Sequence, residues 1–217
     1  MPGCIVFLGP SCDEAAARAI LPGAEFRPPA ARGDIEQAAA EGARLIVLID
    51  GVFLQDCAVG HREVLGVLRA GVTVIGASSM GALRAAELDG LGMVGIGEVY
   101  RRFRAGELES DDEVALVYDP ESGYALSEPL VNIRATLEGA VAEGALSPTD
   151  AAAVIEAAQA LYFPERTWPA ILRRAAVGDA VREAIARRPP IDLKRADAIA
   201  ALEYARDLQA LDRRYRR

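Results

Sequence analysis

The segment VTVIGASSMGALRAAEL, residues 72–88, decides the fold of this chain. It begins with a short apolar run rich in β-branched residues, passes through a turn of small residues, and continues as a helix-forming segment over Met80–Leu88. This order predicts a buried strand followed by a helix. Further strands are predicted at residues 4–8, 25–27 and 45–49, and further helices at residues 13–20, 34–41 and 61–70. Strands that are apolar on both faces and separated by helices are typical of a parallel sheet flanked by helices, so we expect an α/β fold.

The middle of the chain has a different pattern. A glycine-rich turn leads into a predicted helix over Met93–Gly106. Two short apolar runs, Val114–Tyr118 and Tyr124–Leu126, then lie on either side of a group of turn residues. This arrangement predicts a small hairpin.

The last third of the chain reads as helices. Pro129 suits a first helical position, Ser147 suits an N-cap, and Asp34 suits the N-cap of the earlier helix at residues 34–41. We therefore expect two parts. Residues 1–128 form the α/β core with its hairpin insertion, and residues 129–217 form a helical C-terminal region packed on that core.

The composition narrows the function classes. Of the 217 residues, 52% are hydrophobic and 26% are charged, as in ordinary soluble proteins. No apolar run approaches the roughly 20 residues that span a bilayer, and the start lacks a signal-peptide pattern, so we expect a cytoplasmic protein without a membrane partner. Three cysteines and one histidine predict neither a disulfide framework nor a metal site. The net charge of −8 argues against nucleic-acid binding.

Charge is unevenly distributed along the chain. Residues 107–121, the acidic segment, contain seven acids and no base, whereas residues 181–217 contain ten bases and six acids. Such runs are either solvated surface or docking surfaces for partners of opposite charge.

The strand–helix junction carries the strongest chemical signal. A nucleophile elbow consists of a strand, a sharp turn with the serine, and a helix, and small residues two positions before and after the serine relieve crowding. Ala77 and Gly81 occupy these places around Ser79. Backbone N–H groups at the start of the helix, beginning with Met80, would bind a developing oxyanion. The alternatives are that Ser78 is the reactive serine, or that either serine only caps the helix.

A serine nucleophile needs a base, and the chain offers two candidates. His61 begins a helix after an irregular loop, but a lone histidine is more often structural. Lys194 is the only lysine among 24 basic residues. It heads an apolar stripe with Ala198, Ala201, Ala205 and Leu208 at i+4, i+7, i+11 and i+14. Burial there favours the neutral amine, which can act as a base. The structural alternative is a lysine that snorkels to the surface or pairs with Asp197 at i+3.

Weaker candidates surround this junction. Gly9, Pro10 and Ser11 follow the first strand and could bind an anion or polarise a carbonyl. Asp50 ends the strand at residues 45–49, where open α/β sheets place ligand contacts. Arg84 could bind a carboxylate or pair with Glu87 at i+3.

Several of these motifs resemble the TfuA-like protein family. They are FLGPS at 7–11, LIDGVF at 48–53, GASSMGALRAAEL at 76–88, DDEVALVYDPE at 111–121 and SEPLVNIRATL at 127–137. The resemblance implies an accessory role beside YcaO enzymes, which activate peptide amides with ATP during thioamide formation. It also implies sulfide release from a thiocarboxylated ThiS-type sulfur carrier protein by a serine–lysine pair, which falls on Ser79 and Lys194. The precursor peptide would be reached through YcaO.

Two other functions are compatible with the sequence. A non-catalytic adaptor would bind YcaO and improve its engagement with the peptide, with Ser79 as a helix cap. A phosphate- or nucleotide-binding module would use Gly9–Ser11, although neither a GxGxxG motif nor a Walker lysine is present. We expect no cofactor.

Overall fold

The computed structural model describes residues 3–53 and 57–215, so Arg216 and Arg217 of the basic C-terminal segment lie outside the described residues. The chain divides into two compact units. The α/β unit comprises Met1–Asp111 and Lys194–Arg217, and the helical unit comprises Asp112–Leu193. This division differs from the boundary expected after residue 128. Residues 112–128 fall in the helical unit, and the last helix returns to the α/β unit.

A five-stranded parallel sheet forms the centre of the α/β unit, with the order β2-β1-β3-β4-β5. The strands are β1 (Cys4–Phe7), β2 (Glu25–Arg27), β3 (Leu45–Leu48), β4 (Thr73–Ala77) and β5 (Val94–Ile96). Every residue of β1 and β3 is buried, which agrees with their continuous apolar sequence. The predicted α/β class is therefore confirmed.

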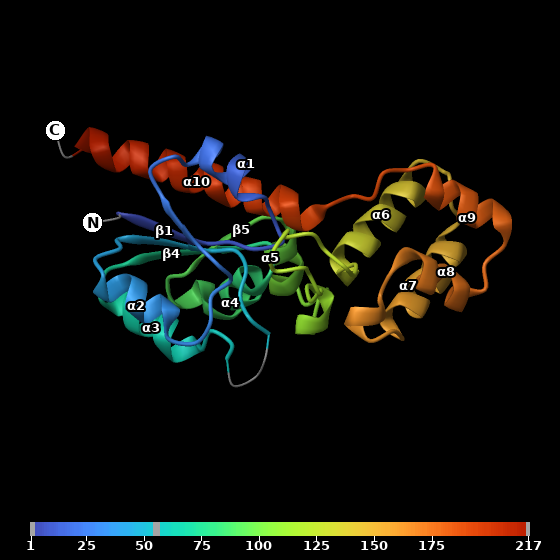
Figure 1. Cartoon of the computed structure of the whole chain (residues 1–217), viewed down its shortest axis with the longest axis horizontal. Helices are drawn as coiled ribbons and strands as arrows, with labels where there is room; N and C mark the ends of the chain where they lie inside the picture. Colours follow the sequence, from blue (N-terminus) through green and yellow to red (C-terminus); the bar gives the residue numbers. More distant parts are fainter. Residues whose placement is uncertain (1–2, 54–56, 216–217) are drawn as a thin grey trace. The chain divides into compact units, whose positions relative to one another are not determined.

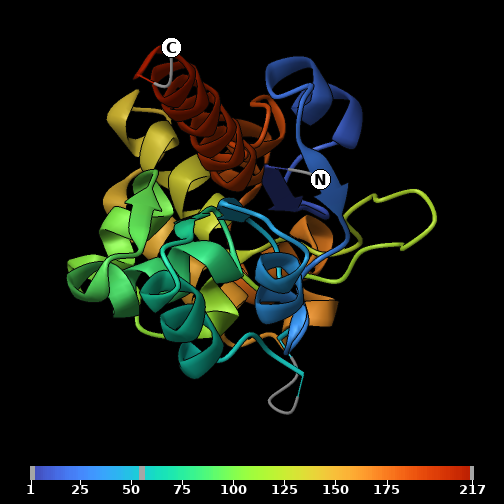
Figure 2. The same ribbon diagram turned by 90° about the vertical axis from the view of Figure 1, so that its left-hand side faces the viewer.

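Helices cover both faces of the sheet. They are α1 (Glu14–Ile20), α2 (Asp34–Ala40), α3 (His61–Arg69), α4 (Met80–Leu88), α5 (Glu98–Arg104) and α10 (Leu193–Tyr215), with a 3-10 turn η1 (Asp89–Leu91) after α4. One apolar cluster joins α1 and α10 to one face, and a second joins α2, α3 and α4 to the other (Figure 1). Figure 2 shows the long helix α10 on the same face of the sheet as α1.

Two local expectations were wrong, and a third, the small hairpin, is present in minimal form. The single helix expected over Met93–Gly106 is instead β5 followed by α5, separated by Gly97 at φ 98°. The sequence does not reveal this strand because its central residue is Gly95, where any Cβ would collide with the ring of Tyr100. Gly33, not Asp34, is the N-cap of α2, and the Asp34 carboxylate accepts a hydrogen bond from the Ala31 amide at 2.7 Å. The predicted hairpin forms with a single antiparallel bridge, between Tyr118 and Ala125, and with backbone hydrogen bonds from Asp119 to Tyr124 and from Leu126 to Val117.

The helical unit has its own core. Its elements are η2 (Asp111–Glu113, mostly in this unit), α6 (Leu130–Ala142), α7 (Pro148–Gln159), η3 (Phe163–Glu165), α8 (Trp168–Ala175) and α9 (Asp179–Ala186). Ser147 caps α7 as expected, since its side chain accepts the Asp150 amide at 3.0 Å. Pro129 is the N-cap of α6 rather than its first residue. Among the described helices, none is long and apolar enough to cross a bilayer.

Candidate active site

Three loops of the α/β unit meet at the carboxyl edge of the sheet. Gly9–Ser11 follows β1, Asp50 follows β3, and Ser78–Ser79 follows β4. These three strands are neighbours and parallel, so the loops after them lie side by side. The strand order reverses between β1 and β3, and such a switch point is where open α/β sheets bind ligands. The residues singled out in the sequence are therefore brought to one place by the topology.

The turn between β4 and α4 is strained at Ser78. Its φ of 67° is a left-handed conformation, which for a residue other than glycine costs about 1–3 kcal/mol. Ser79 follows as the N-cap of α4, with φ −120° and ψ −124°. The spacing of small residues predicts that Ser79 takes the strained position of the turn. In the structure, Ser78 takes that position. Gly81 lets α4 begin tightly against the sheet, because a Cβ there would collide with the Leu48 carbonyl.

A chain of hydrogen bonds joins the three loops. Oδ2 of Asp50 accepts the Gly9 and Ser11 amides at 2.8 and 3.1 Å, and Oδ1 accepts the Ser11 hydroxyl at 2.7 Å. The Ser78 hydroxyl donates to Oγ of Ser11 at 2.9 Å. The direction follows from chemistry: a carboxylate only accepts, so the single Ser11 proton is given to Asp50, and Ser11 must accept from Ser78. We call these four residues, with their shared hydrogen bonds, the Asp50 network.

This network changes the roles expected for the Gly9–Ser11 loop. Gly9 and Ser11 were predicted to offer donors to an oxyanion or substrate. Their amides and the Ser11 hydroxyl are instead all directed at Asp50, which is itself 3% exposed. These donors therefore hold the loop to the end of β3.

Ser79 has a different environment from Ser78. Its side chain makes no cap hydrogen bond, and its hydroxyl has no hydrogen-bond partner among the described residues. The next amide, that of Met80, likewise has no acceptor within the described chain, whereas the Gly81 amide donates to the Ile49 carbonyl at 3.2 Å. A hydroxyl and an adjacent N–H, both uncommitted, thus stand at the start of α4. A hydroxyl and an oxyanion donor are two of the groups that an acyl-transfer site needs, beside a general base.

Lys194 lies in the first turn of α10 and is 2% exposed. The apolar stripe expected beyond it is present. Ala198, Ala201 and Ala205 are fully buried in the cluster that also contains Leu8 and Ala77. Leu8 precedes the Gly9–Ser11 loop and Ala77 precedes Ser78. The helix that carries Lys194 therefore packs on the sheet beside the strand ends from which the serine loops begin.

Asp197 does not serve as the surface partner that a snorkelling Lys194 would need. Its carboxylate accepts the Glu98 and Val99 amides at 2.9 and 2.7 Å and so closes the N-terminus of α5. Burial raises the pKa of the Asp197 carboxyl, while these two hydrogen bonds act in the opposite direction. The side chain thereby fixes the first turns of α10 to α5.

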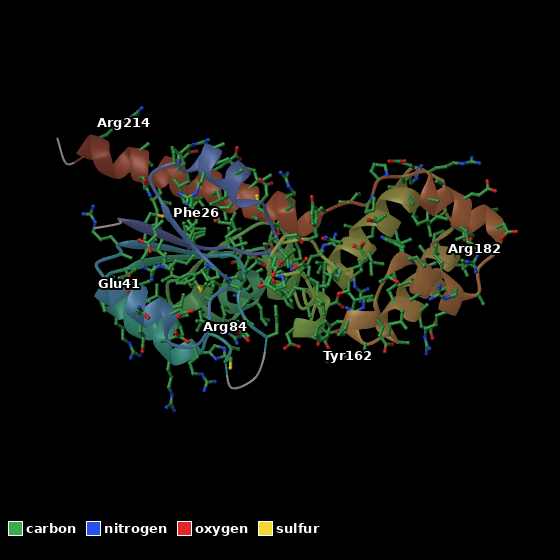
Figure 3. All side chains as sticks on the ribbon, viewed as in Figure 1. Phe26, Glu41, Arg84, Tyr162, Arg182 and Arg214 are labelled. Atoms are coloured by element: carbon green, nitrogen blue, oxygen red, sulfur yellow. The ribbon has the colours of Figure 1, made fainter. Side chains whose placement is uncertain are left out.

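Arg84 and His61 are engaged elsewhere. Arg84 donates to the Val59 carbonyl and to Glu87, both at 2.7 Å, which corresponds to the i+3 pairing considered from the sequence. The His61 ring lies 2.8 Å from the same Glu87 carboxylate and is half exposed. Figure 3 shows Arg84 on the side of the sheet covered by α3 and α4, opposite α10. Sequence reasoning named Glu87 as a partner of Arg84 but did not reveal that the same carboxylate also binds His61.

Comparison with known proteins bears on this geometry. A family model described as TfuA-like protein matches residues 50–167, more than half of the chain. The match includes Asp50, both serines and Arg84, and it ends before Lys194. A search of curated proteins finds no match. Among the described residues, no cluster of three His, Cys, Asp or Glu side chains could hold a metal ion.

Proposed function

Because the chain belongs to the TfuA-like protein family, we propose that it is an accessory hydrolase of peptide backbone thioamidation. In this role it releases sulfide from a thiocarboxylated ThiS-type sulfur carrier and assists a YcaO partner. The family is associated with YcaO enzymes, which fits an accessory protein. The hydrolase proposal is supported by the uncommitted Ser79 hydroxyl beside the uncommitted Met80 amide, together with buried Lys194 on α10, a helix that packs on the same sheet.

The proposed reaction begins with proton transfer. A neutral Lys194 amine takes the proton of the Ser79 hydroxyl as Oγ attacks the carbon of the carrier's C-terminal thiocarboxylate. The Met80 amide stabilises the negative oxygen of the tetrahedral intermediate. Lys194 then gives its proton to the departing sulfur, and hydrosulfide leaves. The carrier stays as an ester on Ser79 until water, activated by the same amine, releases it as a carboxylate.

Ser79 suits the nucleophilic role better than Ser78. Both serines are buried, at 0% and 1% exposure, but the only proton of the Ser78 hydroxyl is directed at Ser11. Attack by Ser78 would therefore require that hydrogen bond to break first. The Ser79 hydroxyl has no hydrogen bond to break, and the neighbouring amide can meet the oxyanion.

The test is sulfide release by the purified protein from a thiocarboxylated carrier. Ser79→Ala should stop release while retaining carrier binding, and intact-mass analysis of the wild type should detect the carrier ester. Because Ser79 makes no cap hydrogen bond, this variant should lose less than the about 0.5–2 kcal/mol of a broken cap. Activity in Ser79→Ala combined with inactivity in Ser78→Ala would transfer the nucleophilic role to Ser78. Activity in both would refute the mechanism.

A non-catalytic adaptor is the second candidate. It is favoured by exposed apolar side chains of the helical unit, since Tyr124 and Tyr162 are 76% and 67% exposed and offer contact area to a partner. Absence of sulfide release from a competent carrier, together with YcaO binding, would establish this reading. A phosphate-binding module is not proposed, because Asp50 occupies the Gly9 and Ser11 amides and its charge opposes an anion.

A further inference from the structure

We propose that Asp50, Ser11 and Ser78 are positioning residues for Ser79, and that they act as one hydrogen-bonded unit. The inference rests on the proposed function, because it assigns these residues to the serine that attacks the carrier. It goes further by giving a catalytic purpose to side chains that touch neither the carrier nor the reacting atoms.

The first step of the argument is the geometry of the turn. Ser79 directly follows Ser78, so the backbone torsions at Ser78 set where the Ser79 hydroxyl and the Met80 amide lie. The Ser78 torsion is left-handed, a conformation that a serine holds only when its surroundings fix it. The bond from the Ser78 hydroxyl to Ser11 is the one side-chain hydrogen bond recorded for that residue among the described residues.

The second step is the anchoring of Ser11. A lone serine on a loop would not hold a strained neighbour in place. Ser11 is fixed at both its amide and its hydroxyl by Asp50, which also holds the Gly9 amide. Ser11, Asp50 and Ser78 are 2%, 3% and 0% exposed, so water does not compete for these bonds.

The third step is the polarity of the network. Each proton points toward Asp50, from Ser78 to Ser11 and from Ser11 to the carboxylate. Every hydrogen-bond donor of the Asp50 network is already bonded inside the protein, so the network has no donor left to bind a substrate. Its remaining consequence for catalysis is the placement of Ser79, and a displacement of about 1 Å at a reacting group can cost about 100-fold in rate.

The experiment is a double-mutant cycle on sulfide release, using the full chain and a thiocarboxylated carrier. Ser11→Ala and Ser78→Ala are compared singly and together, because Asp50→Ala would leave three donors without their acceptor, two of them buried, and could prevent folding. Ser147→Ala is the matched control, since it removes a serine hydrogen bond at the α7 N-cap in the helical unit. Each single variant should lower kcat by about 10- to 100-fold with KM within about twofold, and the double variant should be no slower than the slower single variant.

The outcomes separate the two proposals. Wild-type protein that releases no sulfide from a competent carrier refutes the proposed function, and the inference falls with it. Active wild type with unchanged kcat in both single variants overturns the inference alone. Fully multiplicative losses in the double variant also overturn it, because independent residues would not form one unit. A loss in Ser147→Ala equal to that in Ser78→Ala would show that general destabilisation explains the effect.

Discussion

The carboxylate of Asp112 lies 2.7 Å from the guanidinium of Arg166, a side chain with no exposed surface. Arg166 also donates to the carbonyls of Ala158 and Leu161, both at 3.1 Å, and to the Asp112 carbonyl. It thereby connects the end of α7 to the start of the helical unit. Asp112, one acid of the acidic segment, therefore forms a structural ion pair and is not simply a solvated surface charge. Glu113, which bonds to Arg134 through both oxygens, is another.

Asp112→Lys should destabilise the helical unit. It places a second positive charge beside buried Arg166 and removes a charge-assisted hydrogen bond, which is worth about 1.5–3 kcal/mol. Asp111→Lys is the matched control, because Asp111 is exposed, and it should change stability by less than about 0.5 kcal/mol. Urea unfolding of both variants measures the difference. Equal stability of the two variants would show that Arg166 is satisfied by its carbonyl acceptors alone.

The exposed part of the acidic segment is where partner contacts are expected. Glu109→Lys and Asp111→Lys should weaken association with the YcaO partner and reduce its dependence on salt, because rim charges mainly set encounter rate and salt response. Sulfide release from free carrier should stay unchanged. Glu156→Lys, an exposed acid on α7 outside this segment, is the control. If association of the wild type with YcaO does not depend on salt, these charged side chains make no contact with the partner and are only solvated surface.

The sequence was most informative where periodicity and composition act locally. The apolar runs of β1 and β3 needed no tertiary knowledge, and the apolar stripe after Lys194 follows from helical spacing. The Ser147 cap was equally readable from its neighbours. These features depend on residues within one or two turns of each other.

Features that depend on distant contacts were not readable in this way. The sequence does not reveal β5 because its central residue is glycine. A side chain at Gly95 would collide with the ring of Tyr100, which belongs to the following helix α5. The left-handed torsion of Ser78 is held by Ser11, 67 residues earlier in the chain. Asp50 was recognised as lying at a strand end, but its three donors come from a loop about 40 residues away. Only the sheet order brings these groups together.

Cysteine chemistry should be irrelevant to sulfide release. Burial raises the pKa of the Cys4 thiol to about 12, which leaves about one thiolate in 10⁴ at pH 8. Cys12 is also buried, whereas Cys57 is exposed. Iodoacetamide should therefore add one label to the native protein, at Cys57, and the labelled protein should release sulfide at the wild-type rate. Loss of activity on labelling would indicate a sulfur relay through cysteine instead of a serine ester.

Glu128 should make the helical unit less stable as pH rises. Burial, together with the charge of Asp192, raises the pKa of its carboxyl above the usual 4.5. The folded state therefore favours the protonated form. This contribution is fully present below the usual value and is lost as pH rises through the raised value. Glu128→Gln cannot ionise, so its stability relative to wild type should increase between about pH 4 and pH 8.

Urea unfolding across that pH range measures the difference between Glu128→Gln and wild type. Exposed Glu156→Gln serves as the control and should show no such trend. A constant difference between Glu128→Gln and wild type at every pH would mean that Glu128 is solvated well enough to ionise normally.

The last prediction concerns Lys194, which the proposed mechanism uses to take the serine proton, to give that proton to sulfur, and to activate the water that cleaves the ester. Lys194→Arg keeps a positive charge but removes a group that can lose its proton, since arginine stays protonated in proteins. Lys194→Met keeps an unbranched stem of similar length without the amine. Both variants should lose about 100-fold or more in sulfide release, the usual contribution of a general base.

Because Lys194 is 2% exposed and lies one turn before fully buried Ala198, the bulkier arginine could disturb packing, and the methionine variant guards against that explanation. Circular dichroism and urea unfolding should show Lys194→Met to be folded, and carrier binding should persist. Wild-type release in Lys194→Arg would refute a base role for this residue, and release in Lys194→Met would remove Lys194 from the mechanism entirely.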